Sequence, residues 1–173
     1  MPEHQIRTYT VDCRLGTIFA AESPRGLCAL TLPSHSSRDF ALLLDRRAPG
    51  AAILPVEAQE TLSGRQLLAY LAGQGTALDA PLDLQGLTPF ATAVMQRVRA
   101  IPHGQTLTYG RVAQEVGRPA AARAVGQVMH HNPVPLFVPC HRVLGADGAL
   151  TGFGAGLATK QALLELERGG RLF

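Results

Sequence analysis

Three prolines within seven residues, Pro133, Pro135 and Pro139, constrain the fold of this chain more than any other feature of its sequence. Proline has no backbone N–H and holds φ at about −65°, so a helix interior or a central strand does not tolerate this spacing. The segment NPVPLFVPC is therefore predicted to be an irregular loop, and that loop ends at Cys140.

Most of the chain around this loop is predicted to be helical, at residues 89–100, 109–116, 120–130 and 157–168. Pro102 and Gly104 end the first of these helices, and Thr108 is a candidate N-cap of the second, which closes at Gly117. The tight turn between the second and third helices predicts a helix-turn-helix directly before the proline-rich loop.

The first half of the chain predicts a small sheet with helices. The runs TYTVDC, GTIFAAES and GLCALTL are separated by turn residues and indicate an antiparallel meander. A short helix is expected near 38–46 and a longer one over 55–73, with Pro55 in its first turn and Gly73 as its stop. The pattern indicates an α+β protein with an N-terminal α/β domain at 1–80, a linker at 81–88 and a mostly helical domain at 89–173.

Composition and cysteine usage limit the class of protein. With 46% hydrophobic and 17% charged residues, the chain is able to bury a core, which argues against disorder. No apolar run approaches the roughly 20 residues that span a bilayer. The N-terminus lacks the pattern of a secretory signal, so we expect a cytoplasmic protein with no membrane partner. The three cysteines indicate free thiols, and no CxxC or HxxxH spacing supports a metal site, so no metal is predicted.

Positive charge is concentrated in the second half. Residues 1–88 carry seven arginines and nine acidic residues, whereas residues 89–173 carry nine basic and four acidic residues. Such asymmetry is typical of a polyanionic partner such as nucleic acid, although a solvated basic face gives the same count.

Cys140 is followed directly by His141 and Arg142. Positive neighbours favour the thiolate, which is the nucleophilic form of cysteine. Two other interpretations remain open at this point. A free cysteine is often buried and inert, and neighbouring side chains in an extended segment point to opposite faces.

The segment NPVPLFVPCHRVLGADGALTGFGAG, residues 132–156, resembles the active-site signature of the O6-alkylguanine-DNA alkyltransferases. The similarity extends upstream through IPHGQTLTYGRVAQEVGRPAAARAVGQVMHHNP and downstream to LLELE, so it covers residues 89–168 closely. The N-terminal part, with YLAGQ at 70–74, is similar more loosely. The resemblance implies a ribonuclease-H-like N-terminal domain and a C-terminal domain that binds DNA. It also implies irreversible transfer of a methyl or other alkyl group from guanine O6, and possible action on O4-alkylthymine, once per molecule and without a cofactor.

The same resemblance implies roles for four residues. Cys140 is the alkyl acceptor, His141 is the base that acts through a water, and Glu167 orients His141. Tyr109 is the donor that neutralises the leaving guanine. From the residues alone, Glu167 reads as a solvated helix residue and Tyr109 as a packing residue.

The implied partner is double-stranded DNA with an alkylated guanine, bound through the minor groove with the base flipped out. Arg123 is implied to fill the vacated space, and small neighbours let the helix approach the groove. The predicted DNA-binding set is Arg118, Ala121, Ala122, Arg123, Gly126, Gln127 and Arg142. Arg118 and Arg142 have a structural interpretation as well, and the small residues also fit close helix packing. We expect a monomer in the absence of DNA.

The alkyl pocket is predicted to be lined by Met129, Asn132, Pro135, Val143, Phe153 and Gly154. Asn132 is expected to bond backbone groups and to hold the loop. The sequence departs from the family at Ala91 and Met95, where Gln and Trp are usual, which bears on core packing.

Two other functions remain as alternatives. A protein of the same fold that lacks the acceptor cysteine and only senses alkylated bases is one, and Cys140 argues against it. A Cys-His hydrolase is the other, but no oxyanion-hole signature supports it.

Overall fold

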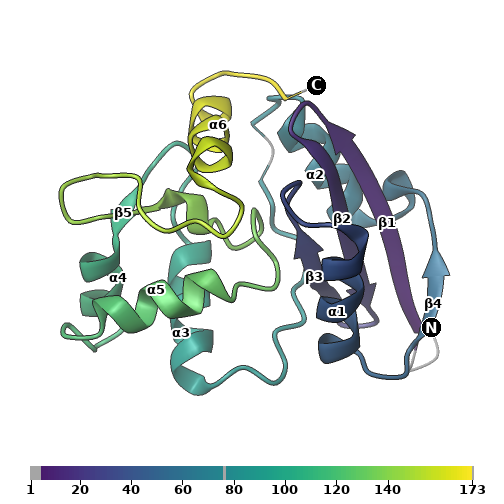
Figure 1. The fold of residues 1–173 in the computed structure, drawn as a ribbon, viewed down its shortest axis with the longest axis horizontal. Coiled ribbons are helices and arrows are strands. Elements are labelled where there is room, and N and C mark those ends of the chain that lie inside the picture. The colour runs from purple at the N-terminus through teal and green to yellow at the C-terminus, as the bar shows by residue number, and fades with distance from the viewer. Residues whose placement is uncertain (1–4, 76, 173) are drawn as a thin grey trace. The chain divides into compact units, whose positions relative to one another are not determined.

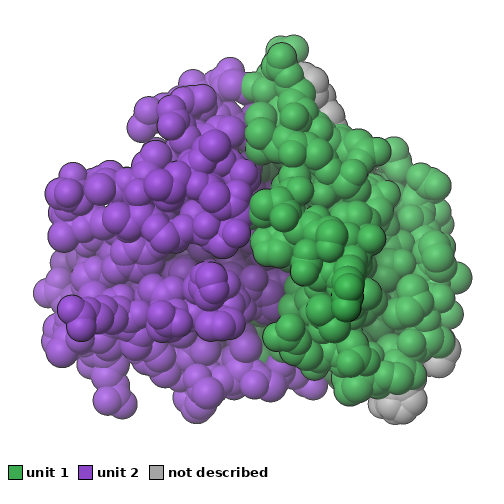
Figure 2. Space-filling model, viewed as in Figure 1, with its two compact units in different colours: residues 1–84, 171–173 green, residues 85–170 purple. Residues whose placement is uncertain are grey.

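The structure, a computed structural model, describes residues 5–75 and 77–172 (Figure 1). These divide into two compact units, coloured separately in Figure 2. Unit 1 comprises residues up to 84 together with 171 and 172, and unit 2 comprises residues 85–170. The mixed content of sheet and helix confirms the predicted α+β class. None of the helices in the described residues is long and apolar enough to span a bilayer.

Unit 1 is built on a four-stranded sheet in the order β3-β2-β1-β4. Strands β1 (Gln5–Cys13), β2 (Gly16–Ser23) and β3 (Gly26–Thr31) form the predicted antiparallel meander. Strand β4 (Ala52–Pro55) was not predicted, and it pairs with β1 in parallel, so the sheet is mixed rather than purely antiparallel.

Helix α1 (Ser37–Arg47) lies where the sequence predicts a short helix. The side chains of Ser36 and Asp39 form a capping box at its start, which satisfies two exposed N–H groups. Phe40 and Leu44 on α1 pack with Ile6, Ala21, Cys28 and Ala29 of the sheet in one buried cluster. The helix therefore covers one face of the sheet (Figure 1).

The predicted helix over 55–73 is wrong at its start. Pro55 ends β4, a 3-10 turn (Ala58–Glu60) follows, and helix α2 spans only Leu62–Leu71. The side chain of Thr61 caps α2 by accepting from the N–H of Gly64. Gly64 has no room for a side chain, because a Cβ there would lie 2.0 Å from the carbonyl oxygen of Ala58. Gly73, with φ of +73°, stops the helix as predicted.

The connection after α2 belongs to unit 1 as far as residue 84, beyond the predicted domain boundary at residue 80. The N–H of Leu27 donates to Pro81 O and the N–H of Asp83 donates to Leu27 O, so residues 81–83 pair alongside β3 instead of forming a linker. The Asp83 carboxylate is buried and accepts from Ser23 and Arg25.

The last described residues also belong to unit 1, although the sequence prediction assigns them to the second domain. The N–H of Arg14 donates to Leu172 O, and the N–H of Leu172 donates to Leu71 O. Leu172 is therefore bonded to the turn that follows β1 and to the last residue of α2.

Unit 2 holds the helices predicted for the second half, each within two residues of its predicted bounds. They are α3 (Pro89–Arg99), α4 (Tyr109–Glu115), α5 (Ala122–His130) and α6 (Leu157–Glu167). Thr108 caps α4 as predicted, and α4 and α5 form the helix-turn-helix. Strands β5 (Leu107–Thr108) and β6 (Val143–Leu144) pair in parallel, and the 3-10 turn η2 (Cys140–Arg142) precedes β6.

Candidate active site

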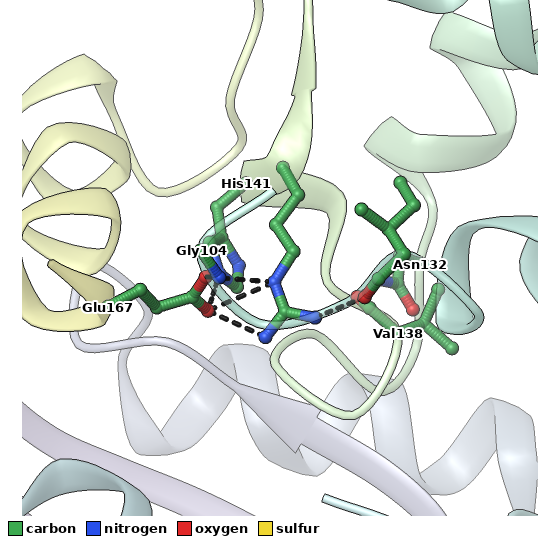
Figure 3. Close-up of polar contacts among 7 residues, drawn as sticks. Gly104, Asn132, Val138, His141 and Glu167 are labelled. Atoms are coloured by element: carbon green, nitrogen blue, oxygen red, sulfur yellow. Dashed lines mark hydrogen bonds and ion pairs between the residues drawn. The ribbon is translucent and has the colours of Figure 1, made fainter. Parts of the chain in front are cut away.

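The proline-rich loop has the irregular form that its sequence predicts, and Asn132 holds it. The side-chain Nδ2 of Asn132 donates to Val138 O at 2.8 Å (Figure 3). The N–H of Val134 donates to Asn132 Oδ1 at 3.0 Å. The N–H of Val138 donates to Val134 O. Leu136, buried between them, has φ of +72°, which is unusual for a residue with a side chain. One amide side chain thus fixes both ends of the loop that leads to Cys140.

Cys140 is buried at the start of η2. Burial raises the pKa of its thiol above the ordinary value, and the Asn132 amide and the charge of Lys160 oppose that shift only in part. The expectation that His141 and Arg142 favour the thiolate is therefore wrong. The charge of Arg142 is directed at a carboxylate, and His141 has its own pKa lowered by burial.

Glu167, at the end of α6, is the hub of a buried polar cluster (Figure 3). Its Oε1 accepts from Nε2 of His141 at 2.8 Å, and its Oε2 accepts from the N–H of Gly104 at 2.9 Å. Arg142 donates to both oxygens, at 2.7–3.0 Å. Burial raises the pKa of this carboxyl, but the bonds from His141 and Arg142 outweigh it and hold the pKa far below the usual range. Glu167 is thus a buried anion, not the solvated residue that the helix pattern alone indicates.

Arg142 was predicted among the DNA-contacting residues, and the structure corrects this. The residue is 7% exposed, and its third nitrogen, Nη1, donates to the carbonyl oxygen of Ile101 at 2.5 Å. All three guanidinium nitrogens therefore donate to acceptors inside unit 2, and the residue is nearly buried, which argues against a phosphate contact. Its structural interpretation is the correct one.

His141 is fully buried, and burial lowers its pKa, while Glu167 acts in the opposite direction and the charges of Arg142 and Lys160 add to the lowering. The imidazole is therefore neutral at pH 7. A neutral imidazole bonded to an ionised carboxylate has the arrangement of a general base with its orienting group.

Lys160 is a further member of the site that the sequence does not predict. It lies on α6 and is fully buried, and its Nζ donates to Val143 O at 2.7 Å and to Thr151 O at 3.0 Å. The same nitrogen lies 5.8 Å from the centre of the Tyr109 ring and 5.9 Å from that of Phe153. Burial lowers its pKa, and Cys140 opposes this shift. A lysine in the first turn of a helix carries no signal of such burial.

Tyr109 begins α4 and is half-buried. Its hydroxyl donates to Thr151 O at 3.4 Å and to Gly152 O at 3.3 Å. Burial and the neighbouring Cys140 both raise the pKa of the phenol, so it keeps its proton at neutral pH. A Cβ on Gly126 would lie 3.9 Å from the Tyr109 ring, so α5 runs directly against that ring.

Of the other predicted pocket residues, only some have contacts with Lys160 and Tyr109 that the structure shows. Val143 accepts a hydrogen bond from Lys160 through its carbonyl oxygen, and the Phe153 ring lies near the same ammonium. Met129 and Pro135 are buried and Gly154 is exposed, and their place in a pocket stays a prediction.

The remaining predicted DNA-binding residues lie on α5 and the turn before it. Arg118, Arg123 and Gln127 are exposed, and Ala121, Ala122 and Gly126 are half-buried. This distribution leaves a helix face of long polar and very small side chains open to a ligand.

Residues 89–169 match the family described as 6-O-methylguanine DNA methyltransferase, DNA binding domain. The methylated-DNA--protein-cysteine methyltransferase of Mycobacterium tuberculosis is 52% identical over 103 residues, which is 60% of this chain and 62% of that protein. The chain thus aligns with less than two thirds of that relative. The bifunctional transcriptional activator/DNA repair enzyme Ada of Escherichia coli is 37% identical over 164 residues, 94% of this chain and 45% of that protein.

Solved structures match over nearly the whole chain. The structure of Mycobacterium tuberculosis OGT in complex with DNA has a TM-score of 0.77 at 38% identity, covering 94% of this chain and 92% of that one. The O6-methylguanine-DNA methyltransferase of Pyrococcus kodakaraensis has a TM-score of 0.71 at 25% identity, covering 92% and 98%.

Proposed function

Because the chain belongs to the 6-O-methylguanine DNA methyltransferase family, we propose that it repairs DNA by moving an alkyl group from guanine O6 to Cys140. The observation that carries the proposal is the buried cluster beside that cysteine. A neutral His141, bonded to the ionised Glu167, directly follows a buried thiol in the chain. This pairing supplies a base for a thiol that keeps its proton at rest.

In the proposed reaction, Sγ of Cys140 attacks the alkyl carbon in line with its bond to O6. The S–C bond forms, and the C–O6 bond breaks with its electron pair leaving on guanine. The thiol proton passes through a water to His141, and Glu167 stabilises the imidazolium. The product is a thioether, which water does not hydrolyse. Each molecule therefore acts once, and the chemistry requires no cofactor or metal.

Tyr109 is the proposed donor to the departing guanine. Its raised pKa supports this role, because a phenol that keeps its proton has a hydrogen bond to give. At present the hydroxyl donates to the carbonyls of Thr151 and Gly152. A guanine in the site would take over that bond. The pocket lining we propose is Met129, Asn132, Pro135, Val143, Phe153 and Gly154.

The proposed partner is duplex DNA with the damaged base flipped out, since the alkyl carbon is not open to in-line attack inside the stack. Arg123, exposed on α5, is the proposed filler of the vacated space. The small residues Ala121, Ala122 and Gly126 support a close approach to the minor groove. Arg118 and Gln127 are proposed backbone contacts. A cytoplasmic location, where thiols stay reduced, suits an acceptor cysteine.

Intact-mass measurement tests this function directly. The protein is mixed with a duplex containing O6-methylguanine, and Cys140→Ser is the matched control. We expect a gain of one methyl group in the wild-type protein and none in the variant. Tight binding to the lesion without a mass gain would instead identify a sensor, and repeated turnover with released product would identify a hydrolase.

A further inference from the structure

We propose that Arg142 is a positioning residue for the transfer: by binding both oxygens of Glu167, it keeps that carboxylate anionic and aimed at Nε2 of His141, so that Nδ1 is the nitrogen that takes the thiol proton. The inference rests on the proposed function, which uses His141 and Glu167 but assigns nothing to Arg142.

The guanidinium of Arg142 contacts both carboxylate oxygens of Glu167 and the backbone of Ile101. Nε of Arg142 lies 3.0 Å from each oxygen of Glu167, and Nη2 lies 2.7 Å from Oε1. Nη1 donates to Ile101 O, and the N–H of Gly104 donates to Oε2 of Glu167. Ile101 and Gly104 belong to one turn after α3. The arginine and the carboxylate are therefore fastened to the same piece of backbone as well as to each other.

This arrangement sets the proton positions on His141. An ionised carboxylate only accepts hydrogen bonds, so Nε2, which faces Oε1 at 2.8 Å, has to carry the proton. In a neutral imidazole the other nitrogen, Nδ1, is then the acceptor. If Glu167 held a proton, the opposite tautomer would be possible and the base would be lost. The guanidinium disfavours the protonated carboxyl of Glu167, because its positive charge and its hydrogen bonds stabilise the buried carboxylate.

Arginine is suited to this role in a way that lysine is not. Its planar fork reaches two carboxylate oxygens and a carbonyl at once, whereas an ammonium is a single nitrogen. The charged groups that act on His141 are Glu167, Arg142 and Lys160. Arg142 has a double effect among them, because it fixes the carboxylate and its own positive charge disfavours the imidazolium.

The test uses Arg142→Met, which removes charge and donors, and Arg142→Lys, which keeps the charge. Arg111→Met is the control, since Arg111 pairs with Glu115 on the exposed side of α4. The first readout is ¹⁵N NMR of the histidine ring nitrogens from pH 5 to 9, without substrate. The second is the pH dependence of methyl transfer from free O6-methylguanine, which leaves DNA contacts out of the measurement.

In the wild-type protein and in Arg111→Met, we expect His141 to be the neutral Nε2–H tautomer down to acidic pH. In Arg142→Met, the His141–Glu167 pair takes up a proton at higher pH, seen as an imidazolium or as the Nδ1–H tautomer. Either form removes the free Nδ1 acceptor, so the pH at which the transfer rate falls on the acidic side rises as well. The rate at pH 6 falls about 10- to 100-fold and recovers toward pH 9, as expected when a general base is already protonated. Arg142→Lys shows a smaller shift in the same direction.

A structural role alone predicts another outcome. If Arg142→Met is less stable but its His141 signals and rate profile match the wild type, the proposal is overturned. If that variant does not fold, Arg142→Lys decides, and the absence of any shift in it overturns the proposal equally. Because the NMR measurement needs no substrate, a failure of the proposed function, seen as no transfer by the wild-type protein, is distinguishable from a failure of this inference.

Discussion

Tyr109 and Lys160 donate to one acceptor, the carbonyl oxygen of Thr151, which lies 3.4 Å from the phenol oxygen and 3.0 Å from the ammonium nitrogen. This carbonyl joins the start of α4, the first turn of α6 and the Gly-rich loop between β6 and α6. The proposed donor to guanine therefore shares its support with a buried lysine.

Replacing Lys160 with methionine should loosen this junction. A hydrogen bond from a charged donor contributes about 1.5–3 kcal/mol, but removing a buried ammonium also relieves its desolvation, so the change in unfolding free energy should stay within about 2 kcal/mol. We expect faster amide hydrogen exchange at residues 151–153 and about tenfold slower transfer. Gln161→Met, at an exposed position on the same helix, is the control. Unchanged exchange at 151–153 would show that the lysine does not hold the loop.

Glu167 should make the protein sensitive to acid. Its pKa is held far below the unfolded value of about 4.3. A depressed pKa contributes stability that is fully present above the unfolded value and is lost as the pH falls toward the folded one. The free energy of unfolding, measured in urea, should thus decline from about pH 4 downward.

The variant Glu167→Gln should lose this part of the acid dependence. At pH 7 it should be less stable by about 3–5 kcal/mol, because Arg142 is left as a buried charge without its anion. The control is Glu165→Gln, at an exposed position two residues earlier on the same helix, and it should change the free energy of unfolding little. Equal losses in the two glutamine variants would argue against the buried cluster.

Asn132→Ala should release the loop before Cys140. Two hydrogen bonds are lost, to Val138 O and from the N–H of Val134, and the expected decrease in unfolding free energy is about 1–3 kcal/mol. Transfer should slow with free O6-methylguanine as well as with DNA, since the thiol itself is displaced. Full activity of the variant on the free base would show that Asn132 does not position the thiol of Cys140.

Arg123→Ala should separate DNA handling from chemistry. Transfer from a duplex should fall by at least about tenfold, as expected when the side chain that stabilises the flipped state is absent, whereas transfer from the free base should not change. Arg46→Ala, an exposed arginine of unit 1, is the control. Loss of both activities would indicate misfolding or a direct part in the chemistry.

Arg118→Ala tests a different kind of contact. A phosphate contact predicts weaker binding to all sequences and a salt dependence whose slope falls by about 1. Binding titrations at several salt concentrations measure this. An unchanged slope would leave Arg118 as a turn residue only.

The helices of unit 2 were predictable because their ends carry local signals. Thr108 caps α4 with its own side chain, and Gly117 follows its last turn with φ of +72°. Strand β4 had no such signal. It is four residues long and exposed throughout, and its partner β1 lies more than forty positions earlier in the chain. Pairing of that kind depends on the folded sheet and not on a local pattern.

The same contrast holds in the site. Cys140, His141 and Asn132 lie within one continuous motif, so the resemblance pointed to them. Arg142 pairs with the distant side chain of Glu167, and both Arg142 and Lys160 donate to backbone carbonyls, which any residue type supplies. A sequence therefore gives no sign that these two charges are buried.

The hydrogen bonds of Leu172 with Arg14 and Leu71 bear on how the chain matures during synthesis. Domains usually fold in order as they leave the ribosome. Here unit 1 has its sheet and α2 after about half the chain has emerged, but the backbone groups that meet Leu172 wait until all of unit 2 has been translated. A chain stalled on the ribosome before residue 172 would therefore hold a nearly complete first unit in which the N–H of Arg14 and the carbonyl oxygen of Leu71 still lack their partner.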